Sequence, residues 1–272
     1  MIVLIVFGSV LLLIVGAFFS QPEPTYNSPP APTVQKVRST PASSTPSINQ
    51  KRLTPALSVT SKPTNPLKNP FQVMNHSVHI ITTASKYTEL IRQMSYACRS
   101  YPVIGLDCEW VTIYGQRQKV ALLQLAFKYG ICLLIRLFQM DSFPTELREL
   151  LANPQIFKVG IEVYYDGQKL LQDYGMEVKG TVDLRHLAKR LRTPGAFGLA
   201  GLAQTVLGIQ LDKDKRISIS DWQSFELSPV QREYAAKDAI VALDLFERFS
   251  QDIPISEMYQ YVDRPFKTRF NR

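Results

Sequence analysis

Apolar and polar positions divide the chain into three stretches. From Ile2 to Phe19 the residues are apolar apart from two glycines and one serine. A helix of this length would span roughly 27 Å, close to the thickness of the hydrocarbon core of a bilayer. The pattern therefore predicts a transmembrane anchor over residues 1–20. A cleaved secretory signal is the alternative, but such signals usually carry basic residues before the apolar run, and only Met1 precedes this one.

Residues 21–70 form the second stretch. They contain eleven prolines among many Ser, Thr and Asn residues. This composition cannot bury enough apolar surface to offset the entropy lost on ordering, so we predict a disordered, semi-extended tether. Its six basic residues outnumber its single acidic residue, Glu23, and an excess of Lys and Arg beside a span is typical of the cytoplasmic side. We therefore expect a membrane-anchored protein whose folded part faces the cytosol.

The third stretch, after Pro70, alternates between strand-like and helix-like periods. Apolar runs predict three antiparallel strands in succession, at 102–109, 119–127 and 131–137. Further elements are predicted as strands at 78–81, 156–159 and 178–182, and as helices at 84–99, 145–151 and 165–174. The last long helix starts after Ser228, because Pro229 and Gln231 complete a capping-box pattern. The mixture predicts an α/β fold in which helices flank a mixed sheet.

Cysteine content and net charge narrow the choice of function. Cys98, Cys108 and Cys132 show no CxxC spacing and are odd in number, which argues against a disulfide framework and a zinc site. A reducing compartment fits them best. The net charge is +8, but the tether, with six basic residues and one acidic residue, supplies +5 of it and leaves +3 after Pro70. Net charge alone is therefore weak support for nucleic-acid binding.

Asp107 and Glu109 stand two residues apart at the end of an apolar strand. Side chains alternate across a strand, so both carboxylates project from one face while Cys108 projects from the other. Two carboxylates so close repel each other unless a cation lies between them, which indicates a metal site. A solvated strand end is the alternative for an isolated pair of this kind.

Two further candidate sites lie on predicted helices. Tyr234 and Asp238 are spaced i, i+4, which places the phenol and the carboxylate on one helical face. Asp166 falls at the start of a helix, where the helix dipole favours a carboxylate in any protein, so a capping role is its alternative. Neither feature is specific by itself.

Taken in order, these segments resemble the DEDD superfamily of 3'-to-5' exonucleases. The resemblance is to the Tyr-containing (DEDDy) branch, with ribonuclease D and the Werner-syndrome exonuclease domain. The matching segments are 103–110 (VIGLDCEW), 158–171 (KVGIEVYYDGQKLL), 199–203 (LAGLA), 220–222 (SDW) and 234–238 (YAAKD). The resemblance covers about residues 78–249. It implies a ribonuclease H-like mixed sheet and a 3'-5' exonuclease domain over 71–255, with 256–272 as a C-terminal tail.

The resemblance also implies a two-metal-ion hydrolysis of phosphodiester bonds in DNA or RNA. Asp107 would bridge two divalent ions, and Glu109 and Asp238 would complete the first site. Asp166 would hold the second ion through water. Oxygen ligands of this kind suit Mg²⁺ or Mn²⁺. Tyr234 is too weak a base to take a proton from water, so it is expected to orient the nucleophile, with packing in the core as its alternative.

Other polar residues have less specific patterns. Lys213, Lys215 and Arg216 form a basic cluster suited to the phosphates of single-stranded or 3'-ended DNA or RNA, although a solvated loop is the alternative. Trp222 can stack on a base, but packing in the core is favoured. His186 lies in a pattern typical of a capped helix start rather than of a metal site.

Within the superfamily, the apolar N-terminus and residues 169–175 (KLLQDYG) look most like the exonuclease 3'-5' domain-containing protein 2 group. Members of that group are associated with the outer mitochondrial membrane and the nucleus, so we expect the anchor in the former, with the nucleus as an alternative. Glu162 departs from the pattern, because relatives commonly have a small or amide residue there. It either lies near the metals or points to solvent. Functions of the longer C-terminal extension of larger members are expected to be absent.

Two other functions remain open. A catalytically silent, membrane-anchored nucleic-acid-binding module or adaptor would keep the fold but is expected to lose acids, and all four are present. Another ribonuclease H-like enzyme, such as an endonuclease or a transposase-type enzyme, also places carboxylates on a similar sheet. The Tyr four residues before the last Asp argues against it. DNA against RNA preference and the oligomeric state do not follow from the sequence.

Overall fold

The computed structural model describes residues 71–212 and 214–267. The predicted transmembrane anchor (1–20) and tether (21–70) lie outside these residues. Among the helices that are described, none is long and apolar enough to cross a bilayer. The residues that carry the predicted chemistry, apart from Lys213, all lie within the described ranges.

A mixed sheet of seven strands forms the centre of the folded unit. Its strands are β1 (Phe71–Val73), β2 (His76–Ile81), β3 (Val103–Ile113), β4 (Gln116–Phe127), β5 (Ile131–Arg136), β6 (Phe157–Gly160) and β7 (Thr181–Asp183). Their order across the sheet is β1-β2-β5-β4-β3-β6-β7. β3, β4 and β5 pair antiparallel in succession, as predicted, whereas β3, β6 and β7 run parallel. The predicted mixed sheet of an α/β fold is confirmed.

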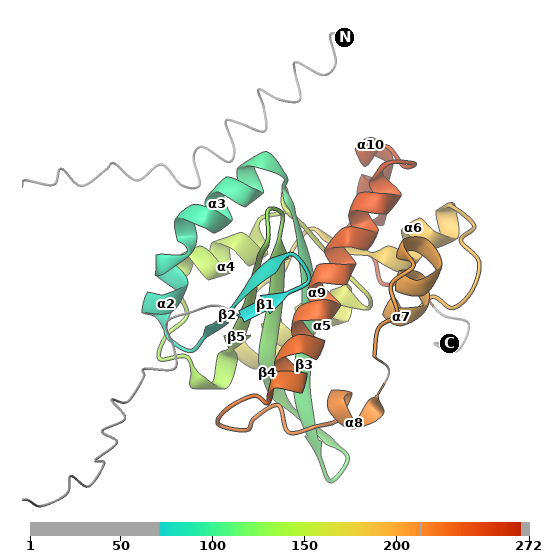
Figure 1. Cartoon of the computed structure of the whole chain (residues 1–272). Coiled ribbons are helices and arrows are strands. Elements are labelled where there is room, and N and C mark those ends of the chain that lie inside the picture. The colour runs from blue at the N-terminus through green and yellow to red at the C-terminus, as the bar shows by residue number, and fades with distance from the viewer. Residues whose placement is uncertain (1–70, 213, 268–272) are drawn as a thin grey trace, which may run out of the picture. The chain divides into compact units, whose positions relative to one another are not determined.

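Helices cover both faces of this sheet. They are α2 (Ala84–Glu89), α3 (Ile91–Ser100), α4 (Thr145–Ala152), α5 (Val163–Tyr174), α6 (Leu184–Arg190), α7 (Leu199–Leu202), α8 (Lys215–Ser218), α9 (Pro229–Ser250) and α10 (Ile255–Met258), with short turns η1 (Leu137–Gln139), η2 (Ala203–Leu207) and η3 (Tyr259–Tyr261). One core lies between the sheet and α6, α7 and α9, and a second between the sheet and α3, α4 and α5. In Figure 1 the long orange-red α9 crosses in front of the green strands β3 and β4.

Most predicted elements appear with small shifts at their ends. The helix predicted over 84–99 is divided at Leu90 into α2 and α3. β3 continues to Ile113 instead of ending at Glu109, because main-chain pairing with β4 persists beyond the apolar run, with a register shift after Glu109. The predicted capping box at Ser228 is present at the start of α9.

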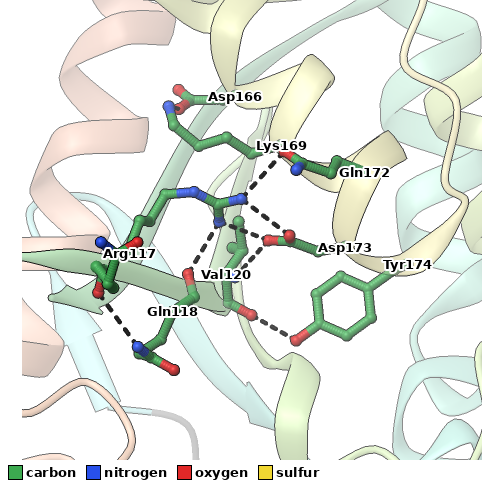
Figure 2. A network of polar contacts seen from close by, with 9 residues as sticks. Arg117, Gln118, Val120, Asp166, Lys169, Gln172, Asp173 and Tyr174 are labelled. Atoms are coloured by element: carbon green, nitrogen blue, oxygen red, sulfur yellow. Dashed lines mark hydrogen bonds and ion pairs between the residues drawn. The ribbon is translucent and has the colours of Figure 1, made fainter. Parts of the chain in front are cut away.

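A polar network ties the β3–β4 hairpin to α5 (Figure 2). Arg117 donates to both oxygens of the Asp173 carboxylate, at 2.7 and 2.9 Å. The same carboxylate accepts the Val120 N–H at 2.8 Å, and the Tyr174 hydroxyl donates to the Val120 carbonyl at 2.6 Å. Since β3 and α5 both carry candidate acids, the network holds in place two elements that must meet at the site.

The segment after α9 closes the β7 edge of the sheet. The Asp263 carboxylate accepts the N–H groups of Gly180 and Thr181, at 3.1 and 2.9 Å. The Asp263 N–H donates to the Thr181 carbonyl at 2.8 Å. These bonds satisfy main-chain groups of an edge strand that would otherwise be exposed.

Candidate metal centre

Three carboxylates from two elements meet at one point. Asp107 and Glu109 lie on β3 and Asp238 lies on α9, and one oxygen of each falls within 4.8 Å of the others. Glu109 is buried, and the other two are partly buried. We call these residues the carboxylate cluster. Together they can offer oxygen ligands to one cation.

Strand alternation and one glycine place the cluster. Its two β3 members face α9, whereas Cys108 between them belongs to the core on the other face. Gly105, two residues earlier, lies so close to α9 that an added Cβ would be 1.9 Å from the Ala239 carbonyl oxygen. Glycine permits this approach because it has no Cβ. The close contact brings Asp238, the neighbour of Ala239, to β3.

Burial raises the pKa of every carboxyl in the cluster, and repulsion between the carboxylates adds to the shift at Asp107 and Glu109. The pKa values of Asp107 and Glu109 lie well above their usual range, first because burial penalises the charge and then because the carboxylates repel each other. Burial raises the pKa of Asp238 to about 7, although the nearby Tyr234 hydroxyl opposes the shift. Within the described ranges, no Lys or Arg forms an ion pair with the cluster. Such a cluster favours an external cation.

Asp166 approaches from the first turn of α5. It is buried, and its Oδ1 lies 2.8 Å from the Lys169 ammonium. Burial raises the pKa of Asp166 to about 6, although Lys169 opposes the shift. The four predicted acids therefore fall into the carboxylate cluster and one residue that is paired with a lysine.

Tyr234 adds a hydroxyl group beside the cluster. It lies one turn before Asp238 on α9, so the phenol and the carboxylate share one face of the helix. Burial and the nearby carboxylates raise the pKa of Tyr234 above its ordinary value. The hydroxyl is therefore protonated at neutral pH and can donate a hydrogen bond. Its ring packs against Trp222, with ring centroids 6.2 Å apart.

A buried ion pair, which the sequence did not reveal, holds the start of α5. Glu162, directly before α5, has a φ of 60°, in the left-handed region that favours glycine. Its N–H donates to the Asp183 carboxylate at 2.9 Å, and Arg185 binds that carboxylate through two nitrogens, at 2.9 and 2.6 Å. Arg185 also binds the Glu162 carboxylate at 3.2 Å. The extra acid at Glu162, whose side chain is 57% exposed, thus shares Arg185 with the buried Asp183.

A cavity of about 350 Å³ lies between β3, α5 and α9. Its acidic lining residues are Asp107, Glu162, Asp166, Asp212, Asp214 and Asp238. Among the described lining residues, Lys169 is the one Lys or Arg, and its ammonium lies 4.2 Å from the centroid of the Trp110 ring. Lys169 was not among the predicted site residues, although its i, i+3 spacing from Asp166 was a usable signal.

The described basic residues of the predicted loop do not line this cavity. Lys213 lies outside the described residues. Lys215 and Arg216 are exposed at the start of α8 and do not line the cavity. Arg216 pairs with Asp214 at 2.6 Å and lines a neighbouring groove beside the start of α9. A role of this loop in nucleic-acid binding stays a prediction.

Trp222 and His186 have structural roles, as favoured from the sequence. Trp222 is fully buried, and its indole N–H donates to the Ser218 carbonyl at 3.0 Å. His186 stacks on Tyr261, with ring centroids 5.3 Å apart. Asp183 caps the start of α6, which confirms the predicted helix cap.

Comparison with known proteins points to one family. The family model described as 3'-5' exonuclease matches residues 78–254. Exonuclease 3'-5' domain-containing protein 2 of Drosophila melanogaster is 38% identical over 171 residues, covering 63% of this chain and 29% of that protein. The Homo sapiens protein of the same name is 35% identical over 182 residues, covering 64% and 29%. The bifunctional 3'-5' exonuclease/ATP-dependent helicase WRN of Mus musculus is 35% identical over 182 residues, covering 66% and 13%.

A crystal structure of the EXD2 exonuclease domain soaked in Mn is 33% identical, with a TM-score of 0.42, and covers 67% of this chain and 92% of that chain. The chain spans less than a third of the length of the three curated relatives named above. The matched range 78–254 includes the carboxylate cluster, Asp166 and Tyr234. The resemblance seen in the sequence is thereby confirmed, and the chain belongs to the 3'-5' exonuclease family.

Proposed function

We propose that this protein removes nucleotides one at a time from the 3' ends of DNA or RNA, with Mg²⁺ or Mn²⁺ as its cofactor. The observation that carries the proposal is the carboxylate cluster, which β3 and α9 bring together without a Lys or Arg partner among the described residues. Membership of the exonuclease family supports this reaction. The presence of all four acids and Tyr234 argues against a silent binding module.

The donor set fits hard divalent cations. Mg²⁺ and Mn²⁺ prefer carboxylate oxygens, and the repulsion within the cluster is relieved by a positive ion. Asp107, Glu109 and Asp238 would hold one ion. Asp166 would hold a second through water, with Asp107 shared between the two. Bound there, two ions would activate the attacking water and stabilise the charge on the leaving oxygen.

The chain's own groups would position the reactants. The Tyr234 hydroxyl, which lines the cavity together with Asp107 and Asp238, would form a hydrogen bond with the attacking water and orient it. The water oxygen bonds to phosphorus as the bond from phosphorus to the 3' oxygen breaks. The water loses one proton, and the 3' oxygen gains one from solvent. The products are a nucleoside 5'-monophosphate and a strand with a new 3' hydroxyl.

Location is a separate part of the proposal. Residues 1–20 would anchor the exonuclease domain (71–255) to the outer mitochondrial membrane through the tether 21–70, with 256–272 following as a tail and the domain facing the cytosol. The apolar run, the proline-rich composition and the similarity to exonuclease 3'-5' domain-containing protein 2 support this. Protease treatment of sealed mitochondria tests it: a cytosolic domain is digested, and a protected one would contradict the proposal.

Digestion of labelled oligonucleotides tests the reaction. The full chain, with Mg²⁺ or Mn²⁺, is given single-stranded DNA and RNA labelled at either end. We expect 5'-labelled strands to shorten stepwise and 3' labels to be released at once as mononucleotides. A double variant, Asp107→Ala with Glu109→Ala, should lose both signals. The relative rates on DNA and RNA rank the substrates.

Two results would contradict the proposal. Cleavage of a linear duplex whose 3' ends are blocked would indicate an endonuclease. Absence of cleavage with both metals, combined with retained strand binding, would indicate the nucleic-acid-binding module.

A further inference from the structure

Lys169 is a cation in the cavity that the proposed reaction does not use. Its ammonium lies 2.8 Å from Asp166 Oδ1 and 4.2 Å from the centroid of the Trp110 ring. The side chain is 19% exposed. Figure 2 shows it extending from α5 to the Asp166 carboxylate, above the network that holds the helix. The ammonium is thus fixed in position yet open to the cavity that it lines.

The charges around the cavity leave one cation available for the substrate. The four predicted acids carry four negative charges, which two divalent ions of the proposed function would neutralise. Glu162 is 57% exposed and shares Arg185 with Asp183, Asp214 pairs with Arg216, and Asp212 is exposed to solvent; neither arginine lines the cavity. A phosphodiester carries a single negative charge. Among the described residues that line the cavity, Lys169 carries the positive charge that can balance the charge of the phosphodiester.

The contacts of Lys169 do not use up its hydrogen-bonding capacity. An ammonium has three donors, and one of them contacts Asp166 Oδ1. The Trp110 ring attracts the ammonium through its π face and consumes no donor. Asp166 Oδ2 accepts no hydrogen bond from the described residues, so it stays available to a metal-bound water. The ion pair and the second metal site are therefore compatible.

We propose that Lys169 is a substrate-binding residue whose ammonium contacts a non-bridging oxygen of the phosphate of the 3'-terminal nucleotide. The inference rests on the proposed function and deepens it by naming the protein group that meets the phosphate. A lysine acts on phosphate as a point charge and reads no base. The contact therefore serves any nucleotide at the 3' end.

Binding of GMP and dGMP, measured by calorimetry on the full chain with Mn²⁺, tests this role. Lys169→Met should weaken GMP binding on the order of 10- to 100-fold, as expected for a lost hydrogen bond to a charged group. It should also raise KM for a 5'-labelled strand more than it lowers kcat. Lys169→Arg keeps the charge and should recover part of the loss. Lys179→Met, which breaks the exposed pair with Glu177, is the matched control and should bind like wild type.

A purely structural ion pair predicts the opposite result. Lys169→Met would then lower the melting temperature and leave GMP affinity and KM unchanged, which would overturn the inference. Tighter Mn²⁺ binding with unchanged GMP affinity would also overturn it, because Lys169 would then only compete with the metal. Lys169-dependent GMP binding without strand cleavage would contradict the proposed function alone. Cleavage of 3' ends with Lys169-independent GMP binding would overturn this inference alone.

Discussion

Two groups of buried carboxylates in the same sheet have opposite surroundings. Asp183, at the end of β7, is 1% exposed and is bound by two nitrogens of Arg185 and by the Glu162 N–H. Asp107 and Glu109, on β3, form no ion pair with a Lys or Arg in the part of the chain that the structure describes. Their pKa values are raised by burial and by mutual repulsion.

The difference separates a charge that stabilises the fold from charges that destabilise it. A buried carboxylate with a buried cationic partner is costly to alter, because the remaining partner is left without compensation. Buried carboxylates that repel each other make the metal-free fold less stable. Buried charges that lower stability in this way are typical of functional sites, where activity requires groups that destabilise the fold.

Removal of one charge from the cluster should have the largest effect on activity. Asp107→Asn keeps the shape but removes a proposed ligand of both ions, so we expect a loss on the order of 10³-fold or more in kcat/KM, since several kcal/mol of charge stabilisation are lost. The melting temperature of the metal-free protein should stay the same or rise. Single-turnover cleavage and thermal unfolding measure the two effects. A drop in melting temperature as large as that expected for Asp183→Asn, described next, would show that the Asp107 carboxylate stabilises the fold as the Asp183 carboxylate does.

Removal of the paired charge should have the largest effect on stability. Asp183→Asn leaves the Arg185 guanidinium, whose side chain is 8% exposed, without its main partner. We expect the free energy of unfolding to fall by about 3–5 kcal/mol. Urea denaturation measures the change. Glu177→Gln, which breaks an exposed pair with Lys179, is the control and should change stability by about 0.5 kcal/mol or less. Similar decreases in the free energy of unfolding of both variants would show that the buried ion pair stabilises the fold no more than the exposed pair.

A methyl group at Gly105 should disturb the contact that assembles the cluster. Its Cβ would lie 1.9 Å from the Ala239 carbonyl oxygen, so α9 must move away from β3. We expect Gly105→Ala to cost about 1–3 kcal/mol and to lower kcat, because Tyr234 and Asp238 move with the helix. Gly198→Ala, where an added Cβ meets nothing within 4 Å, is the control. Wild-type activity in Gly105→Ala would show that the close approach is not required.

The metal-free protein should lose stability as the pH rises. Folding raises the pKa of Asp238 from 3.8 to about 7 and that of Asp166 from 3.8 to about 6. The folded state therefore binds more protons than the unfolded state between about pH 4 and 7, and the free energy of unfolding falls across that window. At pH 8, Mg²⁺ or Mn²⁺ at about 100 times its Kd should raise the melting temperature by roughly 5–10 °C. Thermal unfolding across pH, with and without metal, measures both effects. An equally steep pH dependence in Asp238→Asn would argue against this origin.

The basic loop should have the smallest effect. Lys215 and Arg216 are exposed, and Arg216 already pairs with Asp214. Exposed charges contribute little, so Lys215→Gln and Arg216→Gln should each raise KM by only about 2- to 3-fold. If either side chain contacts a phosphate, the slope of log KM against log salt should fall by roughly 0.7 per lost contact. Initial rates at several salt concentrations measure this slope. An unchanged slope would indicate a solvated loop.

Local patterns in the sequence were enough for the elements and for the faces of the candidate residues. The runs at 119–127 and 131–137 correspond to β4 and β5, and the capping box at Ser228 is present as predicted. Strand alternation placed Asp107 and Glu109 on one face, and helical spacing placed Tyr234 beside Asp238. These signals act over a few residues, so they can be read from the chain directly.

Only the tertiary structure decided which distant side chains meet. The partner of Arg117 lies 56 residues along the chain, and Arg185 reaches Glu162 across 23 residues. Lys169 lies on Trp110 because α5 packs against β3, and the cluster closes because Gly105 lets α9 touch the same strand. The sequence by itself determined the acids, their order and their faces. Strand order and helix packing decided which acids are paired and which are left to a metal, because these depend on contacts between distant segments that no local period encodes.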